Sequence, residues 1–223
     1  MINGRPIIDF GWLADHPDTV VERISQHLVL IVVPMILGIL ISLALAVWAV
    51  RNGRVYGPIT LITGLLYTIP SLAAFAVLRP ITGLSLVTAW IPLTTYTLLI
   101  LFRAFAAGFS AVPSDIIEAA EGMGYTRRER LLRVELPLAV PLMIAGIRLA
   151  SVTSIGLATV VSVLGEQFGG LGQLITDGIQ KFFPTEYLLG AALSVILAFA
   201  ADSLFVRAER LITPWAHARA GAR

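Results

Sequence analysis

An almost unbroken apolar run extends from Leu28 to Val50, and it limits the chain to folds that keep this run away from water. A helix rises about 1.5 Å per residue, so about twenty such residues cross the hydrocarbon core of a bilayer, which is about 30 Å thick. Further apolar runs cover about residues 58–78, 86–105, 138–164 and 187–206. The pattern predicts an all-α integral membrane protein with about five transmembrane helices, in which residues 28–206 form one transmembrane domain.

The composition favours the same class. Hydrophobic residues make up 57% of the chain and charged residues only 13%, whereas an average soluble domain has about 25% charged residues. The small excess of basic residues could indicate a nucleic-acid partner, but these residues cluster beside apolar runs, which membrane topology explains better. We therefore expect a lipid bilayer and no nucleic acid among the partners. The chain has no cysteine, which excludes disulfides and thiolate chemistry.

Pro70 lies in the second apolar run and Pro92 in the third. A proline inside a helix removes one backbone hydrogen bond and kinks it, which membranes tolerate where neighbouring helices or hydroxyl groups satisfy the freed carbonyl. We expect both helices to bend and to face protein in part. The candidate residues of a translocation path lie around these kinks: Tyr67, Pro70, Ser71, Trp90 and Tyr96.

A charged segment, Glu118 to Pro137, separates the third and fourth apolar runs. Charges inside a bilayer are costly and rare, so we expect a loop in water over about residues 107–137. Gly124 fits the left-handed turn that ends a first short helix. Thr126 and Glu129 match a capping box that begins a second.

The ends and the apolar face of these two short helices can also be predicted. Ser114 can cap the first helix, and Pro137 disfavours helical geometry at Leu136 while suiting the start of the next helix. The apolar residues of the first helix recur at spacings of three and four, so a partner surface could bury their common side. They are Ile116, Ile117, Ala119, Ala120 and Met123.

The same segment resembles the EAA loop of bacterial ABC importer permeases. The motif begins with Glu118-Ala119-Ala120, and Gly124 lies four positions after Ala120. Nine residues then separate Gly124 from Val134-Glu135-Leu136-Pro137, in which Val134 stands where that family usually has isoleucine. The resemblance implies a cytoplasmic loop whose short helix docks in a groove on an ATPase subunit. It assigns this coupling to Glu118, Ala119, Ala120, Gly124, Leu136 and Pro137.

Three other segments are similar to those of osmoprotectant permeases, namely Tyr67 to Ala73, Ala145 to Arg148, and Gly169 to Gly172 with Ile175 and Gly178-Ile179. This resemblance implies import of glycine betaine, choline or carnitine by a complex with two ATPases, a second permease of the same or a sister chain, and an extracytoplasmic solute-binding protein. One departure weakens the substrate assignment, because those permeases commonly have Arg-Asn-Thr where this chain reads Arg103-Ala104-Phe105.

Two alternative functions stay open. The first is an ABC importer for another small solute, such as an amino acid. The second is a secondary transporter or channel that acts alone. A secondary transporter usually carries intramembrane carboxylates and paired repeats, whereas Asp202 is the only acidic residue well inside a predicted span.

The orientation follows from the basic residues, because short cytoplasmic loops carry the excess of lysine and arginine. With the charged loop inside, residues 1–27 are an extracytoplasmic segment without the pattern of a signal peptide, and residues 207–223 are a cytoplasmic tail. The expected location is the bacterial plasma membrane, crossed several times. The inner side then holds Arg51, Arg54, Arg103, Arg127, Arg128, Arg130, Arg133, Arg148, Arg207, Arg210, Arg219 and Arg223, against Arg5, Arg23, Arg79 and Lys181 outside.

Two polar features of the apolar part allow more than one interpretation. The glycine-rich segment Glu166 to Pro184 is either a re-entrant or interfacial hairpin or a gate beside the translocation path. Arg148 either reaches to the cytoplasmic interface, which we expect, or faces the interior of the helix bundle.

No catalytic constellation is evident in the sequence. His16, His27 and His217 are scattered without the spacing of metal ligands. A phosphate-binding loop would need a lysine and a serine or threonine directly after its glycines, and none is present. We therefore expect a transport subunit rather than an enzyme, with no cofactor or metal, and with ATP bound by a partner ATPase.

Overall fold

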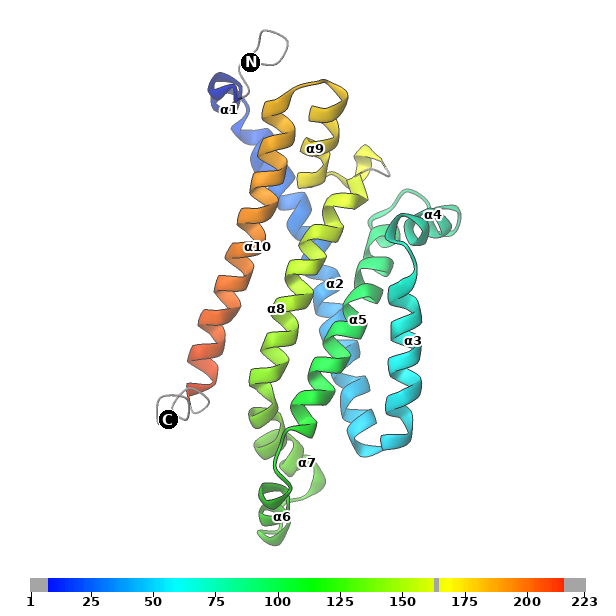
Figure 1. Cartoon of the computed structure of the whole chain (residues 1–223), viewed down its shortest axis with the longest axis vertical. Coiled ribbons are helices and arrows are strands. Elements are labelled where there is room, and N and C mark those ends of the chain that lie inside the picture. Colours follow the sequence, from blue (N-terminus) through cyan, green and yellow to red (C-terminus); the bar gives the residue numbers. More distant parts are fainter. Residues whose placement is uncertain (1–7, 163–164, 215–223) are drawn as a thin grey trace. The chain divides into compact units, whose positions relative to one another are not determined.

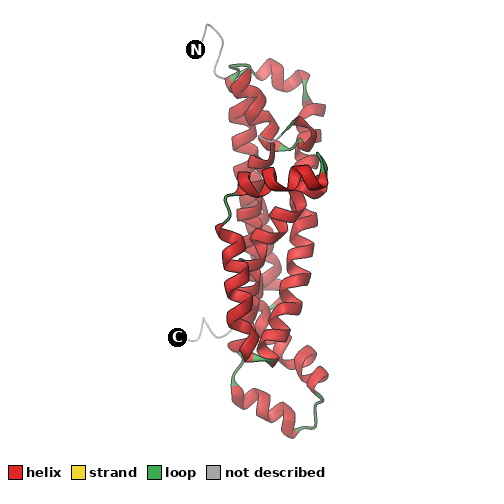
Figure 2. Cartoon of the chain, turned by 90° about the vertical axis from the view of Figure 1, so that its right-hand side faces the viewer, coloured by secondary structure: helices red, strands yellow, loops and turns green. Residues whose placement is uncertain are grey.

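The computed structural model describes residues 8–162 and 165–214, and within these ranges every regular element is a helix (Figures 1 and 2). The longer helices are α2 (Pro17–Arg51), α5 (Leu86–Ser110), α8 (Leu136–Val161) and α10 (Pro184–Ile212). The shorter elements are α1 (Phe10–Asp15), η1 (Gly53–Val55), α3 (Tyr56–Thr68), α4 (Ser71–Thr82), α6 (Ser114–Gly122), α7 (Arg127–Arg130), η2 (Leu131–Glu135), η4 (Glu166–Phe168) and α9 (Leu171–Gln180).

Four helices of the described chain are each long and apolar enough to cross a membrane. They are α2, α5, α10 and the continuous stretch Arg127–Val161, which contains α8. A fifth span is counted only if α3 and α4 together make one. The prediction of an all-α membrane protein with about five spans is therefore confirmed.

The second predicted span differs from the expectation of a kinked helix. The chain leaves helical geometry at Ile69 and Pro70, so that α3 ends at Thr68 and α4 begins at Ser71. Pro70 has extended backbone angles, φ −58° and ψ 131°. A proline disfavours helical angles in the preceding residue and offers no N–H of its own, which accounts for a full break here. By contrast, α5 runs through Pro92 without interruption.

The described residues fall into two compact units, each made of three pieces of the chain. The first unit comprises pieces within Met1–Ile36, Ile69–Thr94 and Ser151–Ala200. The second comprises pieces within Leu37–Thr68, Thr95–Ala150 and Ala201–Arg223.

The second unit is held together by close helix packing at small residues. A Cβ atom at Gly146 of α8 would overlap the side chain of Ala104 on α5, and a Cβ at Gly108 would lie 2.8 Å from the carbonyl oxygen of Ala139. Small residues let membrane helices approach this closely. The large side chain of Phe102 on α5 is fully buried, and α5 and α8 are closely packed.

In the first unit, glycines bring α9 against α8 and α10. A Cβ at Gly172 of α9 would overlap the carbonyl oxygen of Thr159 on α8. On the other side of α9, a Cβ at Gly190 of α10 would lie 2.7 Å from the carbonyl oxygen of Leu171, which is fully buried. The glycines therefore let α9 pack closely against α8 and α10.

Candidate coupling site

The charged loop forms a helical hairpin that lies beyond the ends of α5 and α8 in Figure 1. Its first helix, α6, ends in the predicted left-handed glycine, since Gly124 has φ +82°. The N–H of Tyr125 donates to the carbonyl of Ala120 at 3.1 Å, and the N–H of Gly124 donates to that of Glu121 at 2.9 Å. This pair of bonds is a Schellman motif, which satisfies carbonyls at the helix end. The predicted break after the first helix is confirmed.

The beginning of α6 differs from the prediction. Ser114 is the first helical residue, and the capping position before it is taken by Pro113, which makes no side-chain capping bond. Pro113 has extended angles, φ −60° and ψ 139°, as its ring favours outside a helix. Asp115 lies in the first turn, where the helix dipole favours an anion.

The second helix, α7, begins with the predicted capping box. The backbone N–H of Glu129 donates to the hydroxyl of Thr126 at 3.3 Å, and the backbone N–H of Thr126 donates to Oε2 of Glu129 at 2.9 Å. Each side chain thus satisfies a backbone donor of the other residue, as a capping box requires.

The prediction that Pro137 ends helical geometry at Leu136 is wrong. Leu136 has helical angles, φ −60° and ψ −50°, and α7, η2 and α8 follow one another without a break. The five residues of η2 form a π-helical turn just before the proline. Such a turn changes the hydrogen-bond register where a proline cannot donate to the carbonyl four residues back, so the helix absorbs Pro137 instead of ending.

The predicted coupling residues differ in exposure. Glu118 and Ala119 are exposed on α6, whereas Ala120 is only 1% exposed. The rest of the hairpin, α7 and η2, packs against α6. Met123, at the end of the same helix, is 71% exposed. Leu136 and Pro137 are half-buried at the start of α8. The predicted apolar side of the first helix is therefore divided, because Ala120 is buried within the hairpin and Ala119 and Met123 are exposed.

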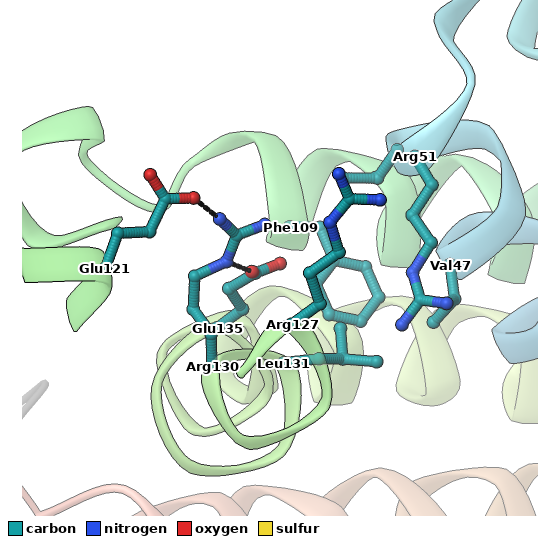
Figure 3. Close-up of a pocket in the computed structure, with 9 residues that line it drawn as sticks. Val47, Arg51, Phe109, Glu121, Arg127, Arg130, Leu131 and Glu135 are labelled. Atoms are coloured by element: carbon teal, nitrogen blue, oxygen red, sulfur yellow. Dashed lines mark hydrogen bonds and ion pairs between the residues drawn. The ribbon is translucent and has the colours of Figure 1, made fainter. Parts of the chain in front are cut away.

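An ion-pair cluster fastens α6 to the rest of the hairpin (Figure 3). The guanidinium of Arg130 pairs with Glu121 of α6 and, at 2.6 Å from its Nε, with Oε1 of Glu135. Glu135 is only 6% exposed. Charged hydrogen bonds of this kind are about twice as strong as neutral ones, so α6, α7 and η2 are linked by side chains as well as by the chain itself.

A cavity of about 360 Å³ lies beside this cluster, between the end of α2 and the hairpin. Its residues in Figure 3 come from α2, α5, α6, α7 and η2. The lining consists of Val47, Val50, Arg51, Phe109, Glu121, Arg127, Arg130, Leu131 and Glu135. The sequence patterns did not indicate this cavity.

The structure brings together two of the five predicted translocation-path residues within one unit. The rings of Tyr67 and Tyr96 meet edge to face, with centroids 5.9 Å apart and planes at 87°. Tyr96 is only 5% exposed and Tyr67 is 40% exposed. The other three, Pro70, Ser71 and Trp90, belong to the first unit, where the buried indole nitrogen of Trp90 has no hydrogen-bond partner among the described residues.

One polar site in the first unit was not predicted. The carbonyl oxygen of the Gln26 side chain accepts from the N–H of Gly170 at 3.0 Å, and Nδ1 of His27 accepts from the N–H of Leu171 at 3.3 Å. Gly169 and Gly170 have φ +59° and +82°, angles that favour glycine. Two side chains of α2 thus satisfy free backbone donors at the start of α9.

Comparisons with known proteins agree with this architecture. The family model described as "binding-protein-dependent transport system inner membrane component" matches residues 30–214. The choline transport system permease protein OpuBB of Bacillus subtilis (strain 168) is 37% identical over 190 residues, which cover 85% of this chain and 86% of that protein. The osmoprotectant import permease protein OsmW of Salmonella typhimurium (strain LT2) is 32% identical over 208 residues, covering 91% and 96%.

A solved structure with the same fold is the MetNI methionine ABC transporter in an inward-facing conformation. It matches with a TM-score of 0.75 and 25% identity, over 86% of this chain and 95% of that one. The family model alone spans most of the chain. This protein therefore belongs to the family of inner membrane components of binding-protein-dependent transport systems, the permeases of ABC importers.

Proposed function

We propose that this permease passes quaternary ammonium osmoprotectants, such as choline, glycine betaine or carnitine, across the plasma membrane. The observation that carries the proposal is the similarity to relatives named for these solutes, at 37% identity over 85% of the chain for the choline permease and 34% over 86% for a glycine betaine, carnitine and choline permease of the same organism. The solute would be delivered by a separate binding protein on the outer side.

In this proposal α6 is the element that receives the motion of the ATPase. Its exposed Glu118, Ala119 and Met123 offer a mixed polar and apolar surface to a partner. The ion pairs of Arg130 tie α6 to η2, and η2 continues directly into α8. A displacement of α6 would therefore reach a membrane-spanning helix without passing through a flexible linker.

The translocation path is proposed to include the aromatic pair Tyr67 and Tyr96. A ring attracts a quaternary ammonium through the negative charge on its face, and an edge-to-face pair leaves one face of a ring free. Only scattered aromatics are available along the path, so the route is weakly binding and passable. High-affinity selection would then reside in the binding protein. Tyr67→Ala should slow uptake without changing the affinity of that protein for its solute.

Reconstitution of the complete importer tests the proposal. Proteoliposomes that contain the permease, its ATPase and its binding protein should take up radiolabelled choline or glycine betaine. They should do so only when ATP is present on the side of the membrane where the ATPase lies. Uptake without ATP or ATPase would favour a carrier that acts alone and would overturn the importer mechanism.

A second candidate, an amino acid importer, is favoured by the fold match to a methionine transporter. Calorimetry on the cognate binding protein separates the two candidates. Heat of binding from a quaternary amine and none from amino acids supports the osmoprotectant assignment. Binding of an amino acid with no response to any quaternary amine would leave the importer class and remove the proposed substrate.

A further inference from the structure

The cavity beside the coupling hairpin contains two arginines that lack an acidic partner. Arg51 ends α2, and Arg127 begins α7. In Figure 3 both side chains lie on the Phe109 side of the cavity, while Arg130 lies between its two glutamates. Within the described chain neither Arg51 nor Arg127 forms an ion pair, in contrast to Arg130. Two like charges that line one cavity repel each other, and an anion between them would relieve that repulsion.

The charge balance of the lining favours an anion with modest charge. Three arginines and two glutamates line the cavity, which leaves a net charge of +1. Both carboxylates, Glu121 and Glu135, are engaged by Arg130, so they are held toward that guanidinium. A guanidinium offers a planar fork of donors that matches two oxygens of a phosphate. A phosphodiester, with its single negative charge, fits this balance.

The apolar part of the cavity distinguishes a lipid from a soluble phosphate. Val47, Val50 and Phe109 line the side formed by the spanning helices α2 and α5, and Val50 is 42% exposed. Arg51 lies at the end of α2, and Arg127 lies at the start of α7. An apolar wall that ends in a basic rim matches an acyl chain joined to an anionic head group, and basic pockets between membrane helices bind such head groups. The volume of about 360 Å³ lies within the range of about 300 to 1,000 Å³ found for small-molecule sites.

We propose that this cavity binds the phosphodiester head group of an anionic phospholipid through Arg51 and Arg127. The lipid would bridge the end of α2 to the start of α7, and so would join a membrane helix to the coupling hairpin. This inference goes beyond the proposed transport function and holds for any transported solute.

Native mass spectrometry of the detergent-purified full chain tests the proposal, with phosphatidylglycerol as the probe and phosphatidylcholine as the neutral competitor. The native chain should retain one tightly bound phosphatidylglycerol. Arg51→Gln with Arg127→Gln should weaken that binding about twenty-five-fold, since each arginine near an anionic lipid contributes about fivefold. Each single variant should weaken it about fivefold, which keeps the test valid if the double variant does not fold.

The matched control is Arg54→Gln with Arg128→Gln. These neighbouring arginines are also exposed, but they do not line the cavity, and the change in net charge is the same. The control should retain the tightly bound lipid. Equal loss in both double variants, or no loss in the single variants Arg51→Gln and Arg127→Gln, would overturn the site.

Two further arms identify the occupant. Inorganic phosphate at millimolar concentration should not displace the phosphatidylglycerol, and displacement would show that the cavity is a soluble anion site instead. Assembly with the ATPase should leave the lipid bound. Its loss on assembly, together with a crosslink from Arg127→Cys to the ATPase, would show that this subunit and not a lipid fills the cavity.

Discussion

The Nε of Arg148 donates to Oδ1 of Asp202 at 2.8 Å, and its Nη2 donates to Oδ2 at 3.2 Å, so that a two-pronged ion pair joins α8 to α10. Glu209, two turns further along α10, lies 3.7 Å from Nη1 of the same arginine. The arginine head is thus turned toward acidic residues of a neighbouring helix, and its place at the cytoplasmic interface stays a prediction. A guanidinium matches a carboxylate in this two-pronged geometry.

We expect this ion pair to stabilise the membrane domain. Arg148→Gln and Asp202→Asn should each lower the free energy of unfolding by about 1 to 3 kcal/mol. The first change leaves Asp202 without its arginine, and the second leaves Arg148 with only the longer contact to Glu209. The double variant should lose less than the sum of the two. Arg207→Gln, an exposed arginine on the same helix, is the control and should change little. Denaturation of the purified variants in detergent measures all four, and strictly additive losses would contradict the coupling.

Local features of the fold could be predicted from the sequence, since their causes lie within a few residues. The capping box of Thr126 and Glu129 and the left-handed turn at Gly124 depend on side chains three residues apart and on a backbone angle that favours glycine. The spans followed from apolar length alone. Each of these signals survives in the structure because no distant contact opposes it.

The features that sequence patterns missed are of two kinds. Some depend on contacts between residues far apart in the sequence, and others depend on which of two backbone conformations a proline favours. Gln26 reaches Gly170, 144 residues away, and Arg148 reaches Asp202, 54 residues away. The repeat of apolar residues along a helix relates only neighbouring turns, so it cannot reveal a contact between residues this far apart in the chain. Pro70 and Pro137 show the second case, because one breaks its helix and the other is absorbed by a π-helical turn. The local sequence of a proline permits both outcomes.

The orientation can be tested with single cysteines, because the chain has none of its own. Asn52 is exposed in the turn after α2, and Phe182 is 79% exposed after α9. An impermeant thiol reagent on intact cells should label Phe182→Cys and leave Asn52→Cys unlabelled until the membrane is opened. The reverse labelling would place α6 outside and remove the proposed ATPase contact.

The left-handed turn at Gly124 should be needed for coupling. A Cβ at Gly124 meets no neighbour within 4 Å, so Gly124→Val acts only through backbone strain, at about 1 to 3 kcal/mol. The matched control is Gly122→Val, two residues earlier, where a Cβ also meets no neighbour and φ is not positive. In the reconstituted importer, solute-stimulated ATP hydrolysis should fall several-fold with Gly124→Val and stay near native with Gly122→Val. Equal activity of the two variants would show that this turn is not part of the coupling element.

The start of α9 should depend on the side chain of Gln26. Gln26→Leu leaves the N–H of Gly170 without its acceptor, which costs about 1 kcal/mol and should speed hydrogen exchange of that amide about fivefold. The control is Thr176→Val, which removes only the bond from the Thr176 hydroxyl to the carbonyl of Gly172 within α9. Exchange measured by mass spectrometry on peptides from this region should rise in Gln26→Leu and stay unchanged in the control. If Gln26→Leu exchanges at the native rate, α2 does not hold the start of α9, and the glycines at 169 and 170 position that helix by themselves.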